Sequence, residues 1–169
     1  CIHDGIWAEK LQDRKFLLAL DKSPWQVTRS DAALADVSLD SAGAYAGEHC
    51  LALWQRGAGD CGISQKDIGV LAGKEYEGYI IAAAVSGEPA LEAVLSWGEG
   101  AAGRQTVPLT GLGQEYRRIP LRFKAGATTE SAAFSIRLVK PGLVWVGCVS
   151  LMPADNVHGM RADVLALIK

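Results

Sequence analysis

Three carboxylates have the residue types that acid–base chemistry on a glycosidic bond requires. Asp4, Glu9 and Asp13 lie close together in the sequence. Hydrolysis of such a bond uses two flanking carboxyl groups, one as an acid and one as a base or nucleophile. On a helix, however, Glu9 and Asp13 would be i,i+4 neighbours that face solvent and do not line a cleft. We therefore interpret all three as structural or solvated residues and predict no catalytic residue.

Five tryptophans are better candidates for contact with a ligand. Sugars present apolar C–H faces, so a protein that binds them often places an exposed aromatic ring where a pyranose can stack, with polar groups nearby. For any single tryptophan, packing in the core remains the more frequent role. The five are Trp7, Trp25, Trp54, Trp97 and Trp145.

Strand alternation separates these tryptophans. Trp54 lies on the face opposite Leu51 and Leu53, which predicts an outward ring. Trp97 shares the face of the apolar residues before it but follows them at the strand end, beside a loop. Trp145 is in the middle of an apolar strand and is predicted to be core. Trp54 and Trp97 are therefore our candidate carbohydrate-binding residues.

Other catalytic or metal-binding patterns are not found in the sequence. It has no G-x-S-x-G nucleophile motif, and the glycine-rich "GEGAAGR" at 98–104 lacks the Lys-Ser/Thr of a phosphate loop. The four cysteines and three histidines are scattered without metal-ligand spacing, so no metal is expected. If 49–55 and 60–66 form a hairpin, Cys50 and Cys61 lie at different heights along it. We therefore predict buried thiols and no disulfide between them.

Charge and hydropathy exclude two classes of partner. The formal net charge of −2 argues against nucleic-acid binding, which needs a basic face. Arg117, Arg118 and Arg122 form a local basic patch that we interpret as a solvated strand face. The longest apolar run, "YIIAAAV" at 79–85, is far shorter than the ~20 residues that span a bilayer, so no membrane partner is expected.

The elements that must position these residues are predicted to be β-strands. Period-two alternation is clear at 115–124, where Ile119, Leu121 and Phe123 share one face. Pro120 in that run cannot donate to a ladder, which predicts an edge or a bulge. Short strands separated by glycine-rich turns indicate a mainly β fold, an antiparallel sandwich or jelly roll of the galactose-binding kind. The predicted strands are 25–29, 49–55, 61–68, 74–86, 90–98, 104–110, 115–124, 132–139 and 142–152.

Short helical segments are predicted at both ends. In residues 1–20, Ile6, Leu11, Phe16 and Leu17 alternate with charges in a helical pattern. From 157 to 169 an apolar stripe recurs at helical spacing, after Pro153 has closed the last strand. We expect this second helix to need a packing partner beyond residues 49–152.

The two ends of the sequence resemble one known family. "DGIWAEKLQDRKF" (4–16) resembles the G-[IL]-W-A-E-x-[LM]-x-[DN]-R-x-F segment of the family 51 glycoside hydrolases, the α-L-arabinofuranosidases. "VWVGCVSLMPADNVHGMRADVLALIK" (144–169) is similar to that family's [IV]-W-[ILV]-x-x-V-S-[LA]-M-P-x-D stretch, including the Gly, Arg and Asp that come after it. "GISQKDIGVLAGKEYEGYIIAA" (62–83) resembles strands of the same region. The resemblance spans essentially the whole sequence, and the two end motifs are specific in combination.

This resemblance implies a modular parent enzyme. Residues 1–20 would belong to the start of a catalytic (β/α)8 barrel, 21–153 to an inserted carbohydrate-binding-like sandwich, and 154–169 to a connector and helix that lead back to the barrel. The family's catalytic glutamates lie in later motifs that do not occur here. Gly147 and Cys148 stand where related modules carry an acidic pair that contributes to a calcium site, which argues against structural calcium.

The resemblance and the residue patterns support three functional hypotheses. The first is a non-catalytic carbohydrate-binding-like domain of an α-L-arabinofuranosidase-type enzyme, with arabinose-containing oligo- or polysaccharide and the catalytic barrel as partners. The second is a purely structural domain that packs on the barrel. The third is a module of a divergent glycosidase with another substrate, such as xylosides. No signal-peptide pattern is present in the first residues, and the compartment is left open between cytoplasmic and secreted.

Overall fold

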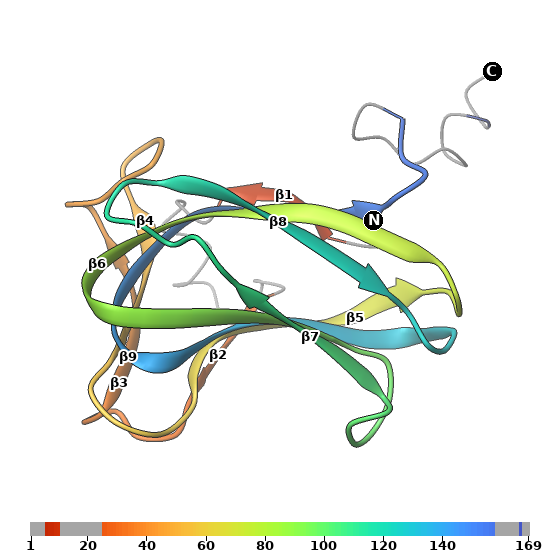
Figure 1. The fold of residues 1–169 in the computed structure, drawn as a ribbon, viewed down its shortest axis with the longest axis horizontal. Helices are drawn as coiled ribbons and strands as arrows, with labels where there is room; N and C mark the ends of the chain where they lie inside the picture. Colours follow the sequence, from red (N-terminus) through yellow and green to blue (C-terminus); the bar gives the residue numbers. More distant parts are fainter. Residues whose placement is uncertain (1–5, 11–24, 158–165, 167–169) are drawn as a thin grey trace.

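The computed structural model describes residues 6–10, 25–157 and 166, and within them nearly every regular element is a β-strand (Figure 1). All strand pairs are antiparallel. The strands are β1 (Ile6–Lys10), β2 (Trp25–Arg29), β3 (Ala35–Asp40), β4 (Cys50–Gln55), β5 (Cys61–Val70), β6 (Glu75–Ser96), β7 (Arg104–Leu109), β8 (Arg117–Lys124) and β9 (Thr129–Pro153).

Two long strands, β6 and β9, run together and bend together, which divides the sheet into two facing layers (Figure 1). At the bend Gly87 lies opposite Gly142, and the register shifts on both sides of Gly87. Gly87 has φ +75°, a left-handed conformation that glycine adopts without steric cost. Each half of the β6–β9 pair is then flanked by a different set of strands.

We name the layers by their edge strands. The β8 layer has the order β8–β6–β9–β4–β3, formed by residues 75–84 of β6 and 142–153 of β9, with β1 paired to β9 beyond the end of β4. The β7 layer has the order β7–β6–β9–β5–β2, formed by residues 91–96 of β6 and 129–140 of β9.

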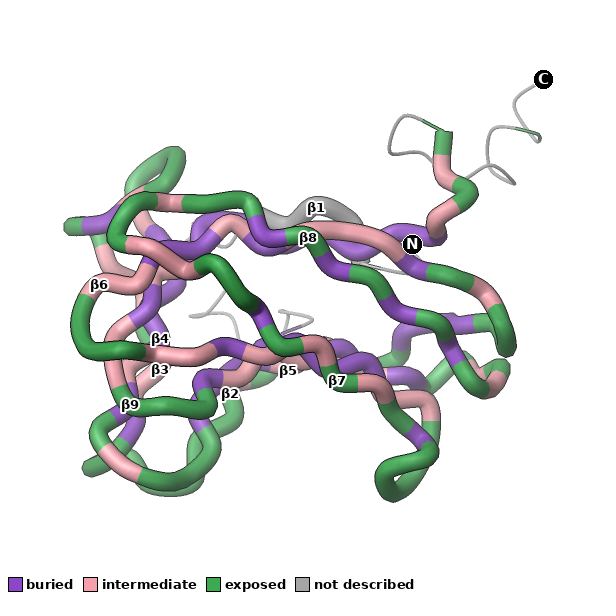
Figure 2. Tube along the Cα trace, viewed as in Figure 1, coloured by how far each residue is buried: buried purple, intermediate pink, exposed green. Residues whose placement is uncertain are grey.

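The core lies between the two layers, and buried residues recur along the strands of both (Figure 2). Phe134 of the β7 layer is at its centre, with its ring centroid 6.0 Å from Phe123 of the β8 layer and 6.4 Å from Trp25. Both contacts are edge-on, the geometry that aromatic quadrupoles favour. The outward residues of the strands are then free to form surface sites.

The structure confirms the predicted antiparallel β-sandwich and corrects its strand connections. Runs 74–86 and 90–98 are one strand, β6, and runs 132–139 and 142–152 are one strand, β9. The glycines and prolines between them form bends, not turns. The conditional hairpin at 49–66 was wrong, because β9 lies between β4 and β5 in strand order. β3 was not predicted from the sequence.

The prediction for β8 was right. Ile119, Leu121 and Phe123 are buried, and the residues between them are exposed. Pro120 pairs with Tyr79 on an edge strand whose only partner in the described part of the chain is β6.

The predicted helical segment in 1–20 was wrong for residues 6–10, which form β1. β4 pairs with β9 only up to Val146, so the edge of β9 beyond it offers unpaired backbone groups. Pairing with that edge outweighs a weak local helix preference, since tertiary context overrides propensity. The other residues of that segment, and the helix predicted over 157–169 apart from Val157 and Ala166, lie outside the described residues.

Candidate functional site

The outer face of the β8 layer carries an open groove of ≈ 710 Å³. It runs over β6, β8 and the last part of β9, and Val107 of β7 also lines it. Strand alternation explains most of its composition, because the residues between the buried positions of β6 and β8 must point away from the core. Leu121 and Val107 are the exceptions, since Leu121 belongs to the core and Val107 packs against it. The lining of the groove consists of Glu77, Gly78, Tyr79, Val107, Arg118, Pro120, Leu121, Arg122, Ser150, Met152 and Asn156.

An arginine covers the aromatic ring in this groove. The guanidinium carbon of Arg118 lies 4.0 Å from the centroid of the Tyr79 ring, a close cation–π contact. The residues come from neighbouring strands, since β6 and β8 pair over residues 75–82 and 117–124. Partial burial raises the pKa of Tyr79 above its usual range, so the phenol stays protonated at neutral pH. The stack holds a planar cationic group at the groove surface.

A second arginine faces the one carboxylate among the groove-lining residues. The Arg122 Nη2 atom lies 3.8 Å from the Glu77 Oε2 atom, and the Arg122 side chain is largely exposed while that of Glu77 is partly exposed. The Asn156 Nδ2 atom donates to Glu77 Oε1 at 3.3 Å and to the Pro153 carbonyl at 2.8 Å. Ion pairs of this exposure contribute little stability, so Arg122 is available to an anionic ligand.

A single carboxylate does not support glycoside hydrolysis. That reaction uses two carboxyl groups on either side of the bond that is cleaved, whereas the lining residues of the groove include Glu77 alone. The described lining of the groove therefore has the groups to bind a polar ligand, and it contains one of the two carboxylates that hydrolysis uses.

The loop between β3 and β4 covers another part of the same face. Residues 41–49 fold back so that Gly43 lies on the Trp145 ring and Tyr45 lies on Gly147. A Cβ atom on Gly43 would approach the Trp145 ring to 2.2 Å, so only glycine fits there. Trp145 Nε1 in turn donates to Asp40 Oδ2 at 3.2 Å. Trp145 is therefore half-buried beneath this loop, in contrast to its predicted place in the core.

Tyr116 holds the covering loop in place from the β8 side. Its hydroxyl donates to the Gly43 carbonyl at 2.6 Å, and its ring lies 5.1 Å from that of Tyr45. Burial raises the pKa of Tyr116 well above its usual range, and burial also raises the pKa of the adjacent Cys50 thiol. Both groups stay protonated at neutral pH.

The two tryptophans predicted to bind carbohydrate lie in different parts of the sandwich. Trp54 is on the outer face of β4, in the β8 layer, and the Arg56 guanidinium carbon is 5.0 Å from its ring centroid. Trp97 follows β6 at the far end of the β7 layer, where it packs against the core and against Gly126. The structure does not bring the two rings into one groove.

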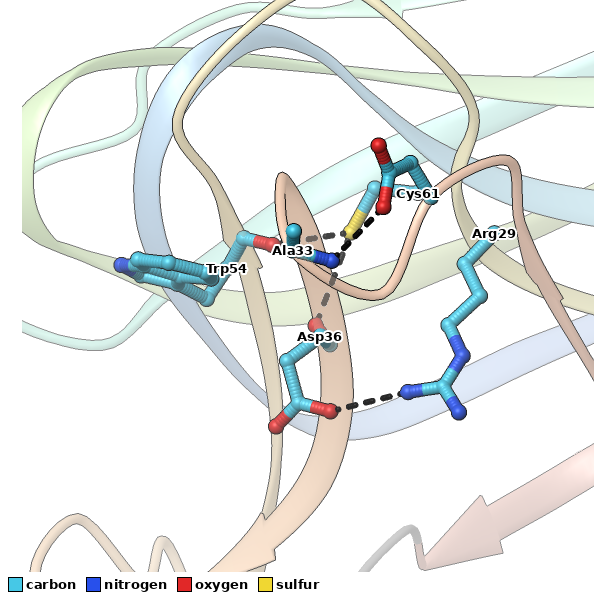
Figure 3. A network of polar contacts seen from close by, with 6 residues as sticks. Arg29, Ala33, Asp36, Trp54 and Cys61 are labelled. Carbon is cyan, nitrogen blue, oxygen red and sulfur yellow. Dashed lines mark hydrogen bonds and ion pairs between the residues drawn. The ribbon is translucent and has the colours of Figure 1, made fainter.

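A buried thiol on β5 contacts backbone carbonyls at the end of the β3–β4 pair (Figure 3). The Cys61 Sγ atom lies 3.4 Å from the Trp54 carbonyl and 3.6 Å from the Asp36 carbonyl. Burial raises the pKa of Cys61 to about 11. Asp36 also pairs with Arg29 at 3.3 Å. Cys50 and Cys61 are both free cysteines, as predicted.

Two kinds of site do not occur among the described residues. No group of three or more His, Cys, Asp or Glu side chains is placed to hold a metal ion in that part of the chain. Within the same residues, no helix has the length and hydropathy that a membrane span requires.

Comparison with solved structures identifies the fold. The CBM22-1 xylan-binding domain from Paenibacillus barcinonensis Xyn10C has a TM-score of 0.63 and 14% identity, over 92% of this chain and 98% of that chain. The CBM22-1–GH10 modules of the Clostridium thermocellum xylanase Xyn10B, complexed with xylohexaose, have a TM-score of 0.62 and 10% identity, over 88% of this chain and 28% of that one. This chain has the fold of a carbohydrate-binding module.

The same fold also occurs in another setting. The enzymatically active domain of tailspike protein 4 from bacteriophage CBA120 matches with a TM-score of 0.61 and 10% identity, over 85% of this chain and 21% of that one. No protein-family model matches this sequence, and no curated protein matches it. Identities this low establish the fold alone, so function must be argued from the groove.

The residues that form the groove were only partly visible in the sequence. The alternation of 115–124 placed Arg118 and Arg122 on one outward face. The pairing of β8 with β6, which sets Arg118 over Tyr79, depends on contacts about 40 residues apart in sequence and had no local signal.

Proposed function

We propose that this chain is a non-catalytic carbohydrate-binding module of an α-L-arabinofuranosidase-type glycoside hydrolase that acts on arabinose-containing glycans. The observation that carries the proposal is the open groove on the outer face of the β8 layer, in a sandwich with the fold of carbohydrate-binding modules. The parent and its arabinose-containing substrate are inferred from the sequence resemblance of residues 4–16 and 144–169.

The groove has the mixture of groups that glycan binding uses. Pro120 and Met152 supply apolar surface, while Ser150, Asn156 and Arg118, which is stacked on Tyr79, supply hydrogen-bonding groups. Sugar sites combine such apolar surface with a few polar groups that fix the orientation of the hydroxyls. Trp54, further along the same outer face, is proposed as a second contact for a longer chain, and Trp97 as a separate contact at the end of the β7 layer.

Binding to a glycan panel tests this proposal. The chain is titrated with soluble arabinoxylan, arabinan, xylan and galactan in calorimetry and affinity electrophoresis. We expect binding to an arabinose-containing member, and a loss of at least about tenfold in affinity for Tyr79→Ala, because Arg118 then loses the ring that holds it in the groove. Trp54→Ala and Trp97→Ala are tested alongside, each with a thermal melt to show that the variant is folded.

One observation favours the second candidate, a structural domain on the catalytic barrel. β1, which lies in the segment that resembles the barrel's beginning, pairs directly with β9 of the sandwich. That pairing would join barrel and module rigidly. Under this alternative the folded chain binds no member of the glycan panel, and deletion of the module from the parent enzyme lowers its melting temperature.

A further inference from the structure

We propose that the groove selects glycans that carry uronic acid substituents, whose carboxylates are bound by Arg118 and Arg122. This inference rests on the proposed function and deepens it, since it names the chemical class of ligand for the same groove. Both arginines line the groove and both belong to β8.

The guanidinium of Arg118 takes the place where a neutral sugar would stack. A pyranose ring stacks on an aromatic face, but one face of Tyr79 is already covered by Arg118 at 4.0 Å. The surface offered there is therefore a planar cation with N–H donors. Guanidinium groups match carboxylates in a two-point geometry with two parallel hydrogen bonds.

The Tyr79 ring holds the Arg118 side chain in place, and no carboxylate among residues 25–157 forms an ion pair with it. Ion pairs in that region join other residues, and Arg118 is in none of them. The stack on Tyr79 restricts the side chain before a ligand arrives, which lowers the entropy that binding must remove. A guanidinium that is held by an aromatic ring and not by a carboxylate fits an anionic ligand.

The charges that line the groove favour an anion overall. Arg118 and Arg122 contribute two positive charges and Glu77 one negative charge, so the lining has a net charge of +1. The whole chain has a formal net charge of −2, so this region differs in sign from the rest of the protein. Arg118 and Arg122 are four residues apart on one strand, which separates their backbone positions by about 13 Å. Carboxylates on different residues of one glycan could therefore reach both.

The negative charge of Glu77 opposes the binding of an anionic ligand, and this effect can be tested. Its carboxylate lies 3.8 Å from Arg122 and would repel the carboxylate of a ligand in the same groove. Removing its charge should therefore strengthen the binding of an acidic glycan and leave a neutral one unaffected. The change Glu77→Gln keeps the size of the side chain and an oxygen that can accept from Asn156.

The test compares two xylo-oligosaccharides with the same backbone, one bearing a glucuronic acid branch and one neutral, by calorimetry at low and at high salt. We expect about tenfold tighter binding of the acidic ligand at low salt, because hydrogen bonds to charged groups are the stronger ones. Salt should reduce this ratio. Arg118→Gln should bring the ratio close to one, Arg118→Lys should keep part of it, and Glu77→Gln should raise it.

Arg104→Gln, an exposed arginine on β7 of the other layer, is the matched control and should leave the ratio unchanged. Equal affinity for both ligands, binding of neither of them by a chain that binds a member of the glycan panel, or an unchanged ratio in folded Arg118→Gln overturns the uronate assignment while leaving glycan binding in place. If the folded chain binds neither these ligands nor any member of the glycan panel, the proposed function fails as well.

Discussion

The contact between Gly43 and Trp145 gives the sharpest prediction of stability. In Gly43→Ala the new Cβ atom would lie 2.2 Å from the indole ring, far inside van der Waals contact. The ring cannot simply move away, because its Nε1 atom is held by Asp40. The loop of residues 41–49 must therefore lift, which breaks the hydrogen bond from the Tyr116 hydroxyl to the Gly43 carbonyl.

The size of the effect can be worked out from these two contacts. Overpacking in a well-packed region costs about 1–3 kcal/mol, and loss of the hydrogen bond adds about 0.5–1.5 kcal/mol. We expect the free energy of unfolding to fall by about 1.5–4.5 kcal/mol, which lowers Tm by roughly 3–18 °C for a domain of this size. Urea and thermal unfolding, followed by circular dichroism, measure both quantities.

Two further variants make the test specific. Gly57→Ala is the matched control, because its Cβ would meet only Leu34 at 3.7 Å, an ordinary contact. It should change the unfolding free energy by less than about 0.5 kcal/mol. In a Trp145→Leu background, Gly43→Ala should cost much less, since the ring it strikes is gone. If Gly43→Ala unfolds like the wild type, the packing of this loop on the sheet is refuted.

Two other predictions concern the buried thiol and the bend. The pKa of Cys61 is raised by burial from 9.0 to about 11, so its stabilising contribution is complete below pH 9 and is lost as the pH rises toward 11. This loss amounts to about 3 kcal/mol. Denaturant titrations at a series of pH values should show it in the wild type but not in Cys61→Ala. If the unfolding free energies of the two proteins change in parallel with pH, the prediction is contradicted. Gly87→Ala should cost about 1–2 kcal/mol through its φ of +75°, whereas Gly98→Ala should cost less; equal costs in urea unfolding contradict the bend.

The layered fold could be predicted because the alternation of apolar and polar residues within each strand shows which residues face the core. In β8 the buried residues Ile119, Leu121 and Phe123 alternate with exposed ones, and that pattern fixes which face each arginine occupies. The bend could not be predicted in the same way. A glycine and a proline near 87–89 resemble a turn in sequence, and only the paired bend of β9 at Gly142 shows that β6 continues.

The candidate site was predicted less well than the fold. Trp54 was correctly assigned to an outward face, but the groove is centred on Tyr79 and Arg118, which were not selected as a pair from the sequence. Their contact depends on the register between β6 and β8, which is set by tertiary packing. Likewise, the cover over Trp145 depends on how the loop of residues 41–49 folds back, for which strand periodicity carries no information.

Glycan binding through the outer face of the β8 layer is open to a residue-by-residue test. An amide NMR titration of the chain with an arabinoxylan oligosaccharide provides it, because each residue reports its own contact. We expect saturable shifts for Tyr79, Arg118 and Ser150, with the β7-layer residues Ser64 and Ser135 unmoved. Shifts confined to the β7 layer, or no shift at saturating oligosaccharide, would show that this face is not the binding surface.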